Sequence, residues 1–160
     1  MFISVFTNYF IMQKLTCLFI ALLLGVGTAF SQTEEEKIKQ LVEAETADFA
    51  KMSFADVVKK HWILDDKTVA MATMPDGNHL QMKKDELLAL TATPPEGHAQ
   101  VRKFDYIFFI NGTTALVYFS QEVSTDEGDK VNSHEMRYLE KVNGEWKIHA
   151  SSVHQFLPKG

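Results

Sequence analysis

The sequence predicts an α+β domain in which helices come first and long antiparallel strands follow. Helical periodicity runs through residues 34–51, where apolar side chains recur on one stripe and three glutamates occupy the first turn. Ser53 and Asp56 have the spacing of a capping box and indicate the start of a second helix. After Gly97 the residues favour strands, which are separated by Asn-Gly dipeptides and one polar loop.

The segments between the second helix and the long strands are short. Strands are expected at 68–73 and 79–82, on either side of the turn Pro75-Asp76-Gly77-Asn78. A third helix follows at 84–90 and is stopped by Thr93-Pro94-Pro95. The long strands form two hairpins, expected at 101–110 with 113–123 and at 131–142 with 145–156.

The composition is that of an acidic globular protein. Of 160 residues, 46% are hydrophobic and 23% are charged, and the net charge is −5. Lys14 is the one charged residue among residues 1–31, so residues 32–160 carry a net charge of −6. The sequence contains no cluster of Lys and Arg, which disfavours nucleic acid and anionic membranes as partners. The single cysteine, Cys17, precedes residue 32, so residues 32–160 can form neither a disulfide nor a thiolate metal site.

Residues 1–31 have the pattern of a cleavable secretory signal. Lys14 supplies the positive region and residues 18–26 supply the apolar region. Ala29-Phe30-Ser31 places small residues at the two positions that a signal peptidase reads. We therefore expect cleavage before Gln32 and a periplasmic or secreted protein.

A membrane anchor is the alternative for this segment. Residues 1–11 are also apolar and would lengthen the hydrophobic run, but residues 16–30 alone are short for a span of about 20 residues. Met12 is a possible true start of the chain. We expect no membrane anchor after processing, and a single domain at 32–160.

The last hairpin carries the most informative stretch, residues 135–148 (EMRYLEKVNGEWKI). It resembles the Arg…Gly-x-Trp-x-Ile/Val signature of the association (hub) domain of calcium/calmodulin-dependent kinase and of small bacterial, polyketide-cyclase-like proteins of the nuclear transport factor two-like superfamily. The resemblance covers residues 34–157. It implies a cone-shaped fold in which a helix pair and a short third helix pack on a strongly curved antiparallel sheet and enclose a cavity, and it implies a homodimer built on the outer sheet face. Because this fold hosts isomerases, dehydratases, cyclases, hydrolases and non-catalytic binders, it indicates no particular activity.

The register of the last hairpin predicts which side chains face the cavity. A two-residue turn at Asn143-Gly144 pairs Val142 with Glu145, and cross-strand partners share a face. The face that carries Trp146 then also holds Glu135, Arg137, Leu139, Lys141, Ile148, Ala150, Ser152 and His154. We interpret this apolar face as the inner one. A three-residue loop would instead place Met136 and Tyr138 beside Trp146.

Two groups of polar residues on this inner face are candidates for a ligand pocket. Arg137 beside Glu135 can bind an anion, because a guanidinium offers a carboxylate two parallel donors. The alternative is a buried ion pair that only closes the cavity. If Arg137 instead lines an empty pocket, Arg137→Met should be mild. Ser152 and His154 can reach one ligand, although a single histidine in a strand can equally be structural.

The first hairpin supplies a third candidate pair. A turn at Asn111-Gly112 groups Asp105 with Tyr118, and if this face is the inner one, Asp105 can act as a general base with a hydroxyl partner. The alternative is a carboxylate at the edge, in water. The hub relatives carry a further pocket arginine where this sequence has Ser120, which weakens the inference of the same anion. Trp62 is expected in the cavity wall or the core.

Neither a metal nor a cofactor is expected. His134, His149 and His154 suggest a metal site, but the predicted register places His154 on the face opposite the other two. The sequence contains no phosphate loop, nucleophile elbow or His-Glu-x-x-His motif.

Three functions remain open at this point. The first is a non-catalytic module that binds a small molecule, and the second is an isomerase, dehydratase or cyclase with Asp105 or His154 as its base. The third is a purely structural oligomerisation domain. An enzyme of this kind needs an inward acid or base in an otherwise apolar cavity, so the cavity lining separates the first two.

The leader generates the first testable prediction. The exported protein should begin at Gln32 or within a residue or two of it, because the small residues before Gln32 match the peptidase site. N-terminal sequencing of the periplasmic or secreted form measures this directly. Retention of residues 12–31 in that form would contradict the prediction.

Overall fold

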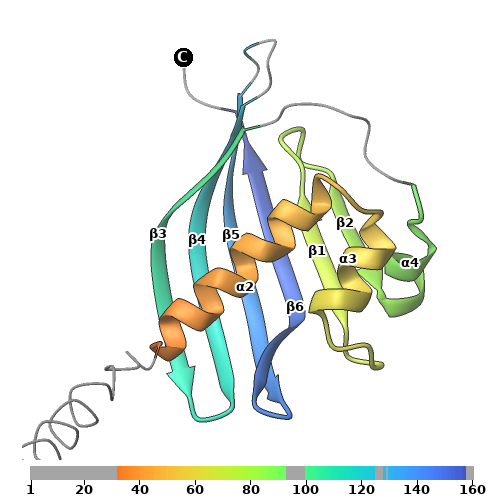
Figure 1. The fold of residues 1–160 in the computed structure, drawn as a ribbon. Coiled ribbons are helices and arrows are strands. Elements are labelled where there is room, and N and C mark those ends of the chain that lie inside the picture. Colours follow the sequence, from red (N-terminus) through yellow and green to blue (C-terminus); the bar gives the residue numbers. More distant parts are fainter. Residues whose placement is uncertain (1–31, 93–99, 125–127, 129, 158–160) are drawn as a thin grey trace, which may run out of the picture. The chain divides into compact units, whose positions relative to one another are not determined.

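The computed structural model of the chain describes residues 32–92, 100–124, 128 and 130–157. The predicted leader lies outside these ranges. Residues 33–160 form a compact unit of their own. In its described part, three helices pack on a six-stranded sheet, which confirms the predicted α+β class (Figure 1).

The helices begin where side-chain caps satisfy their first backbone amides. In front of α2 (Glu34–Phe49), the Thr33 hydroxyl accepts from the Glu36 amide at 3.2 Å, and the Glu36 carboxylate accepts from the Thr33 amide at 2.9 Å. Ser53 caps α3 (Phe54–His61), as its spacing to Asp56 predicts. The third helix, α4, spans Lys84–Ala89.

Six strands form one mixed sheet in the order β2-β1-β6-β5-β4-β3. Their bounds are β1 Val69–Thr73, β2 His79–Lys83, β3 Gln100–Asn111, β4 Thr114–Ser124, β5 Lys130–Val142 and β6 Glu145–Phe156. All neighbours are antiparallel except β1 and β6, which pair in parallel. The predicted sheet was purely antiparallel, and the parallel pair arises because the first hairpin joins the edge of β6.

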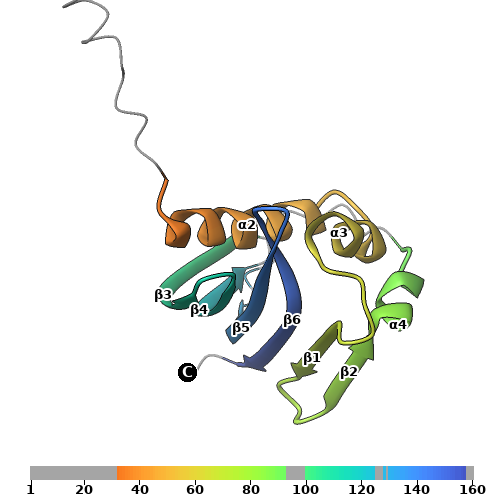
Figure 2. The same ribbon diagram turned by 90° about the horizontal axis from the view of Figure 1, so that it is seen from below.

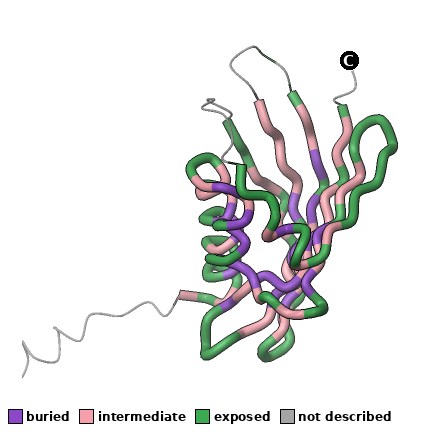
Figure 3. Tube along the Cα trace, turned by 90° about the vertical axis from the view of Figure 1, so that its right-hand side faces the viewer, coloured by how far each residue is buried: buried purple, intermediate pink, exposed green. Residues whose placement is uncertain are grey.

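The helix α2 crosses the long strands on one face of the sheet, which we call the inner face, and the sheet curls beneath it (Figure 2). Buried residues gather where helices and sheet meet (Figure 3). The core consists of Ile38, Val42, Val58, Trp62, Ala70, Leu87, Ala115, Val117, Phe119, Leu139, Trp146 and Ile148. The opposite side of the sheet, the outer face, has no helix packed on it within the described ranges.

The last hairpin confirms the predicted turn and then departs from the predicted register. Asn143 and Gly144 have φ values of 54° and 87°, and Val142 pairs with Glu145. The pairing shifts between Tyr138 and Leu139, because β6 accommodates an extra residue in a β-bulge. Beyond the bulge Arg137 pairs with Ser151, so the later residues of β6 change faces.

The first hairpin also differs from the prediction. Its turn is Gly112-Thr113, because Asn111 stays in the ladder and pairs with Thr114. A second irregularity lies between Phe104 and Ile107, where Asp105 has a positive φ of 56°. This bulge turns Lys103 and Tyr106 to the same side of β3, although strict alternation would place residues three positions apart on opposite sides.

None of the helices in the described part of the chain combines the length and apolar character that a membrane crossing requires.

Trp146 joins the sheet to the first turn of α2 and generates a stability prediction. Its ring is buried, and its Nε1 donates to Glu34 Oε2 at 2.7 Å. Trp146→Ala should lower the free energy of unfolding by about 3–5 kcal/mol, since it empties a core site. Urea denaturation measures this loss. Trp146→Phe, which keeps an aromatic ring but removes the hydrogen bond and part of the ring volume, should cost clearly less. Equal losses would show that the remaining ring contributes nothing to stability.

Candidate ligand site

A chain of buried charges links α2 to the inner face of β5. Glu45, on α2, has no exposed surface, and Arg137 Nε donates to its Oε2 at 3.1 Å. The same guanidinium donates from Nη2 to Glu135 Oε2 at 2.9 Å. Trp62 Nε1 and the Ser133 hydroxyl donate to the remaining oxygens of Glu45 and Glu135, at 2.7 and 2.8 Å. The two glutamates therefore use all four carboxylate oxygens inside the protein.

This arrangement keeps Arg137 charged and occupied. Burial opposes its protonated form, but the attraction of Glu45 and Glu135 outweighs burial and raises the pKa of Arg137. A buried ion needs compensation of this kind, because an unpaired charge in a low-dielectric interior is very costly. The guanidinium thus lies between two carboxylates and not at an open anion site.

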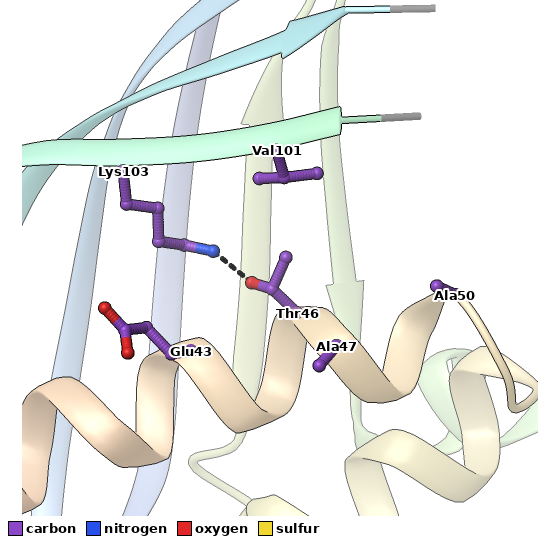
Figure 4. A pocket seen from close by; sticks show the side chains of 6 residues that line it. All are labelled: Glu43, Thr46, Ala47, Ala50, Val101 and Lys103. Carbon is purple, nitrogen blue, oxygen red and sulfur yellow. Dashed lines mark hydrogen bonds between the residues drawn. The ribbon is translucent and has the colours of Figure 1, made fainter. Parts of the chain in front are cut away.

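An open pocket lies next to this network, between the second half of α2 and the start of β3 (Figure 4). Its volume is about 300 Å³, which is the lower end of the range for small-molecule sites. Its walls are small apolar side chains with a few polar groups: Glu43, Thr46, Ala47, Ala50, Val101 and Lys103. The pocket therefore suits a small and largely apolar molecule.

Lys103 supplies the amine of this pocket. Its amine donates to the Thr46 hydroxyl, which in turn donates to the Val42 carbonyl oxygen at 3.2 Å. Burial lowers the pKa of Lys103 to about 8, and repulsion by Arg137 acts in the same direction, against the attraction of nearby glutamates. With this pKa, roughly a tenth of the amine is unprotonated at pH 7 and carries a free lone pair.

Phe119 connects the pocket lysine to the buried network. The Lys103 amine lies 5.5 Å from the centre of the Phe119 ring, and the Arg137 guanidinium carbon lies 5.4 Å from it. Tyr106 stacks on the same ring at 5.3 Å. Within the described ranges, its hydroxyl is a buried polar group without a hydrogen-bond partner, and burial raises the pKa of Tyr106.

The structure brings together three of the residues that the sequence singled out. Trp62, Glu135 and Arg137 are all buried on the inner side, where Trp62 and Arg137 share Glu45 as a partner. The inner face predicted from the two-residue turn is thereby confirmed for the part of the hairpin before the bulge and for Arg137 and Glu135. A mild effect of Arg137→Met was expected only if Arg137 lined an empty pocket. Because Arg137 is paired with Glu45 and Glu135, that condition is not met.

The other four candidates lie elsewhere: the inward placement predicted for Ser152 and His154 is wrong, and Asp105 matches the alternative of a carboxylate in water. Asp105 and Tyr118 are exposed on the outer face, and Tyr118 pairs with Ile107 instead of Asp105. Ser152 and His154 pair with Met136 and His134 on the same outer face. The extra residue in β6 causes the change for Ser152 and His154, because it reverses the side to which the residues after it point. Tyr118 lies on the outer face because its neighbours in β4, Val117 and Phe119, are the buried ones.

The bulge in β6 also alters the histidine pattern. His134 and His154 are direct cross-strand partners, so the register argument that separated them is wrong. His149 is buried apart from them, between Asp65 at 2.8 Å and Glu140 at 2.9 Å. Burial opposes the protonated form of His149, but the hydrogen bonds to Asp65 and Glu140 outweigh burial and raise the pKa of His149. In the described ranges, no group of three or more His, Cys, Asp or Glu side chains has the spacing of a metal site.

Glu45, Thr46 and Lys103 were not predicted from the sequence as site residues. Glu45 was detectable, because it interrupts the apolar stripe of α2 three residues after Val42 and four before Phe49. A charged residue at such a position indicates either that the segment is not an amphipathic helix or that the charge is buried and paired with an opposite charge. Lys103 gave no such signal, since only the bulge after it decides the side of the sheet it faces.

Known structures with the same fold come from several organisms. A protein of the NTF2-like type from Cytophaga hutchinsonii superposes with a TM-score of 0.53 at 17% identity, over 76% of this chain and 98% of its own. An NTF-2 like protein of unknown function from Shewanella oneidensis MR-1 reaches 0.57 at 13% identity, over 76% and 99%. The CaMKII hub of S. rosetta reaches 0.57 at 15% identity, over 75% and 95%.

These likenesses support the resemblance found in the sequence and show that the chain has the NTF2-like fold. At such identities they show the fold alone. No protein-family model matches the sequence, and no curated protein matches it.

The buried network generates a prediction for Arg137. Arg137→Met should lower the free energy of unfolding by about 3–5 kcal/mol, because it leaves Glu45 and Glu135 buried without a counterion. Urea denaturation measures the loss. Replacing both glutamates by Gln in the Arg137→Met background should recover much of it, since no buried charge then remains. A single variant as stable as the parent protein would show that the network contributes nothing.

Proposed function

We propose that the protein is an exported domain that binds a small molecule in the pocket between α2 and β3 and pairs with a second copy through the outer face of its sheet. The pocket is the observation that carries the binding function: it has a volume of about 300 Å³ and an amine that points at its wall. Apolar walls with a small number of placed polar groups are typical of a binding site for a small ligand, and this pocket combines Ala47, Ala50 and Val101 with Glu43, Thr46 and Lys103.

Binding is favoured over the enzymatic alternative by the position of the predicted bases. That alternative needed Asp105 or His154 to face an apolar cavity. Both side chains are exposed on the outer face, across the sheet from α2. Arg137, the other candidate for ligand binding, is already paired with two carboxylates.

The pairing proposal rests on two rows of uncharged side chains that cross the outer face. One row runs through Ile107, Tyr118, Met136, Ser152 and Met71, and the next through Phe109, Leu116, Tyr138, Ala150 and Val69. Phe109 is 60% and Ile107 56% exposed, which is unusual for large apolar side chains on neighbouring strands. Val153 is not part of these rows, since it pairs with the buried Glu135.

A second copy of the chain is the partner that these rows fit. Two identical uncharged surfaces can face each other across a twofold axis without placing like charges together. A structure of the same fold, the S. rosetta CaMKII hub, is by its name an assembling element. Export is supported by the signal pattern of residues 1–31.

Native mass spectrometry of the exported protein tests both parts of the proposal. The expected result is a dimer that carries a small molecule, which is lost on denaturation. Introducing lysines at Ile107 and Phe109 should give a folded monomer, because each dimer would bury four added charges. Leu64→Lys, at an apolar loop residue that is 39% exposed, is the matched control and should leave the dimer intact. A parent protein that is monomeric at micromolar concentration would contradict the pairing, and an empty pocket would contradict the binding.

A further inference from the structure

Lys103 has an environment that a merely structural lysine does not need. Its amine is withdrawn from solvent at a pocket wall, and the hydrogen bond to Thr46 fixes its direction (Figure 4). The Thr46 hydroxyl donates its proton to the Val42 carbonyl oxygen, so the hydroxyl oxygen must accept the hydrogen bond from Lys103. No carboxylate in the described part of the chain forms a salt bridge with this amine. The N–H groups and the lone pair of this nitrogen that are not used by Thr46 are therefore available to a molecule in the pocket.

We propose that Lys103 is the capture group of this pocket and that its amine forms a reversible imine with a small, neutral aldehyde or ketone. This inference rests on the proposed binding function and names its ligand class. The geometry supplies three requirements of such a reaction: a nitrogen held at the pocket wall, a cavity for the carbonyl compound, and a carboxylate that can carry protons.

The reaction balances without any additional reagent. The lone pair on Lys103 Nζ attacks the carbonyl carbon and forms the N–C bond, while the π electrons of the C=O bond move to oxygen. That oxygen then takes up both amine protons and leaves as one molecule of water, and the nitrogen lone pair forms the C=N bond of the imine. Glu43 lines the same pocket and can carry a proton from nitrogen to the leaving oxygen. Hydrolysis returns the free amine by the same steps in reverse.

The charges around the pocket decide the class of carbonyl compound. Burial keeps the pKa of Lys103 at about 8 in spite of Glu135, Glu45 and Glu43. Arg137 faces away toward its two glutamates and is not available to pair with an acid group. Glu43, which also pairs with Lys39 at 3.9 Å, is the carboxylate at the wall and disfavours a second carboxylate on the ligand, whereas Ala47, Ala50 and Val101 suit a short hydrocarbon chain.

Reductive labelling tests the inference on the mature protein. The probe is butanal with cyanoborohydride, which converts an imine into a stable alkyl-lysine that peptide mass spectrometry locates. At about pH 7.5, a pKa of about 8 gives Lys103 on the order of a hundredfold more unprotonated amine than an ordinary lysine. We expect Lys103 to be labelled at least about tenfold faster than Lys39, an exposed lysine on the same side of α2, since a lower pKa also reduces nucleophilicity.

Two variants separate capture in the pocket from simple reactivity. Ala47→Leu fills the pocket and should slow the labelling of Lys103 several-fold without changing Lys39. Ala44→Leu, on the exposed surface of the same helix, is the matched control and should change neither. Equal slowing by both variants would overturn the assignment of the pocket.

Each failure points to one proposal. Labelling of Lys103 no faster than that of Lys39 would overturn the imine inference and leave binding of another ligand in the pocket standing. Equal labelling by glyoxylate, which carries a carboxylate, would overturn the neutral class. Selective labelling of Lys103 in a protein that carries no molecule after purification would overturn the proposed resident ligand while supporting the capture chemistry.

Discussion

The ion network of Glu45, Arg137 and Glu135 is the constraint on which the arrangement of this unit depends. It joins α2 to β5 across 92 residues of sequence, through the Arg137–Glu45 contact of 3.1 Å. Because all three groups are buried, the helix cannot slide or rotate on the sheet without exposing an unpaired charge to an apolar interior. The network therefore specifies one orientation of α2, whereas apolar packing alone would tolerate several. The price of this specificity is that Arg137 has no capacity left for a ligand.

The pocket follows from that orientation. With α2 anchored at Glu45, its next residues, Thr46 and Ala47, are held over the start of β3 at a distance that leaves room for a small molecule. Lys103 reaches this space from the strand and finds the Thr46 hydroxyl as its acceptor. Burial lowers the pKa of Lys103, and the attraction of Glu135 and Glu45 limits that decrease. The same network thus positions the pocket wall and tunes the electrostatics of its amine.

Two β-bulges divide the chemistry of the sheet between its faces. The bulge in β3 turns Lys103 to the inner face, and the extra residue in β6 moves His154 to the outer face. Both bulges lie midway along long strands, where added twist lets the sheet curl beneath α2. The outer face consequently gains exposed polar residues at one end, beside the uncharged rows that contain Ile107 and Phe109. Curvature and the distribution of functional groups therefore have the same physical origin.

Local sequence patterns determined most of the secondary structure of this protein. Caps, Asn-Gly turns and the alternation of apolar residues act over a few residues, so the helix starts, both ends of the strands and the turn at Asn143 were predictable within one or two positions. The inner placement of Arg137 followed from the same alternation. The tertiary structure decided what alternation cannot express: a bulge reverses every later side chain, and its position depends on how the sheet bends beneath a helix distant in sequence. For that reason only the folded chain places Lys103 in the pocket and Glu45 beside Arg137.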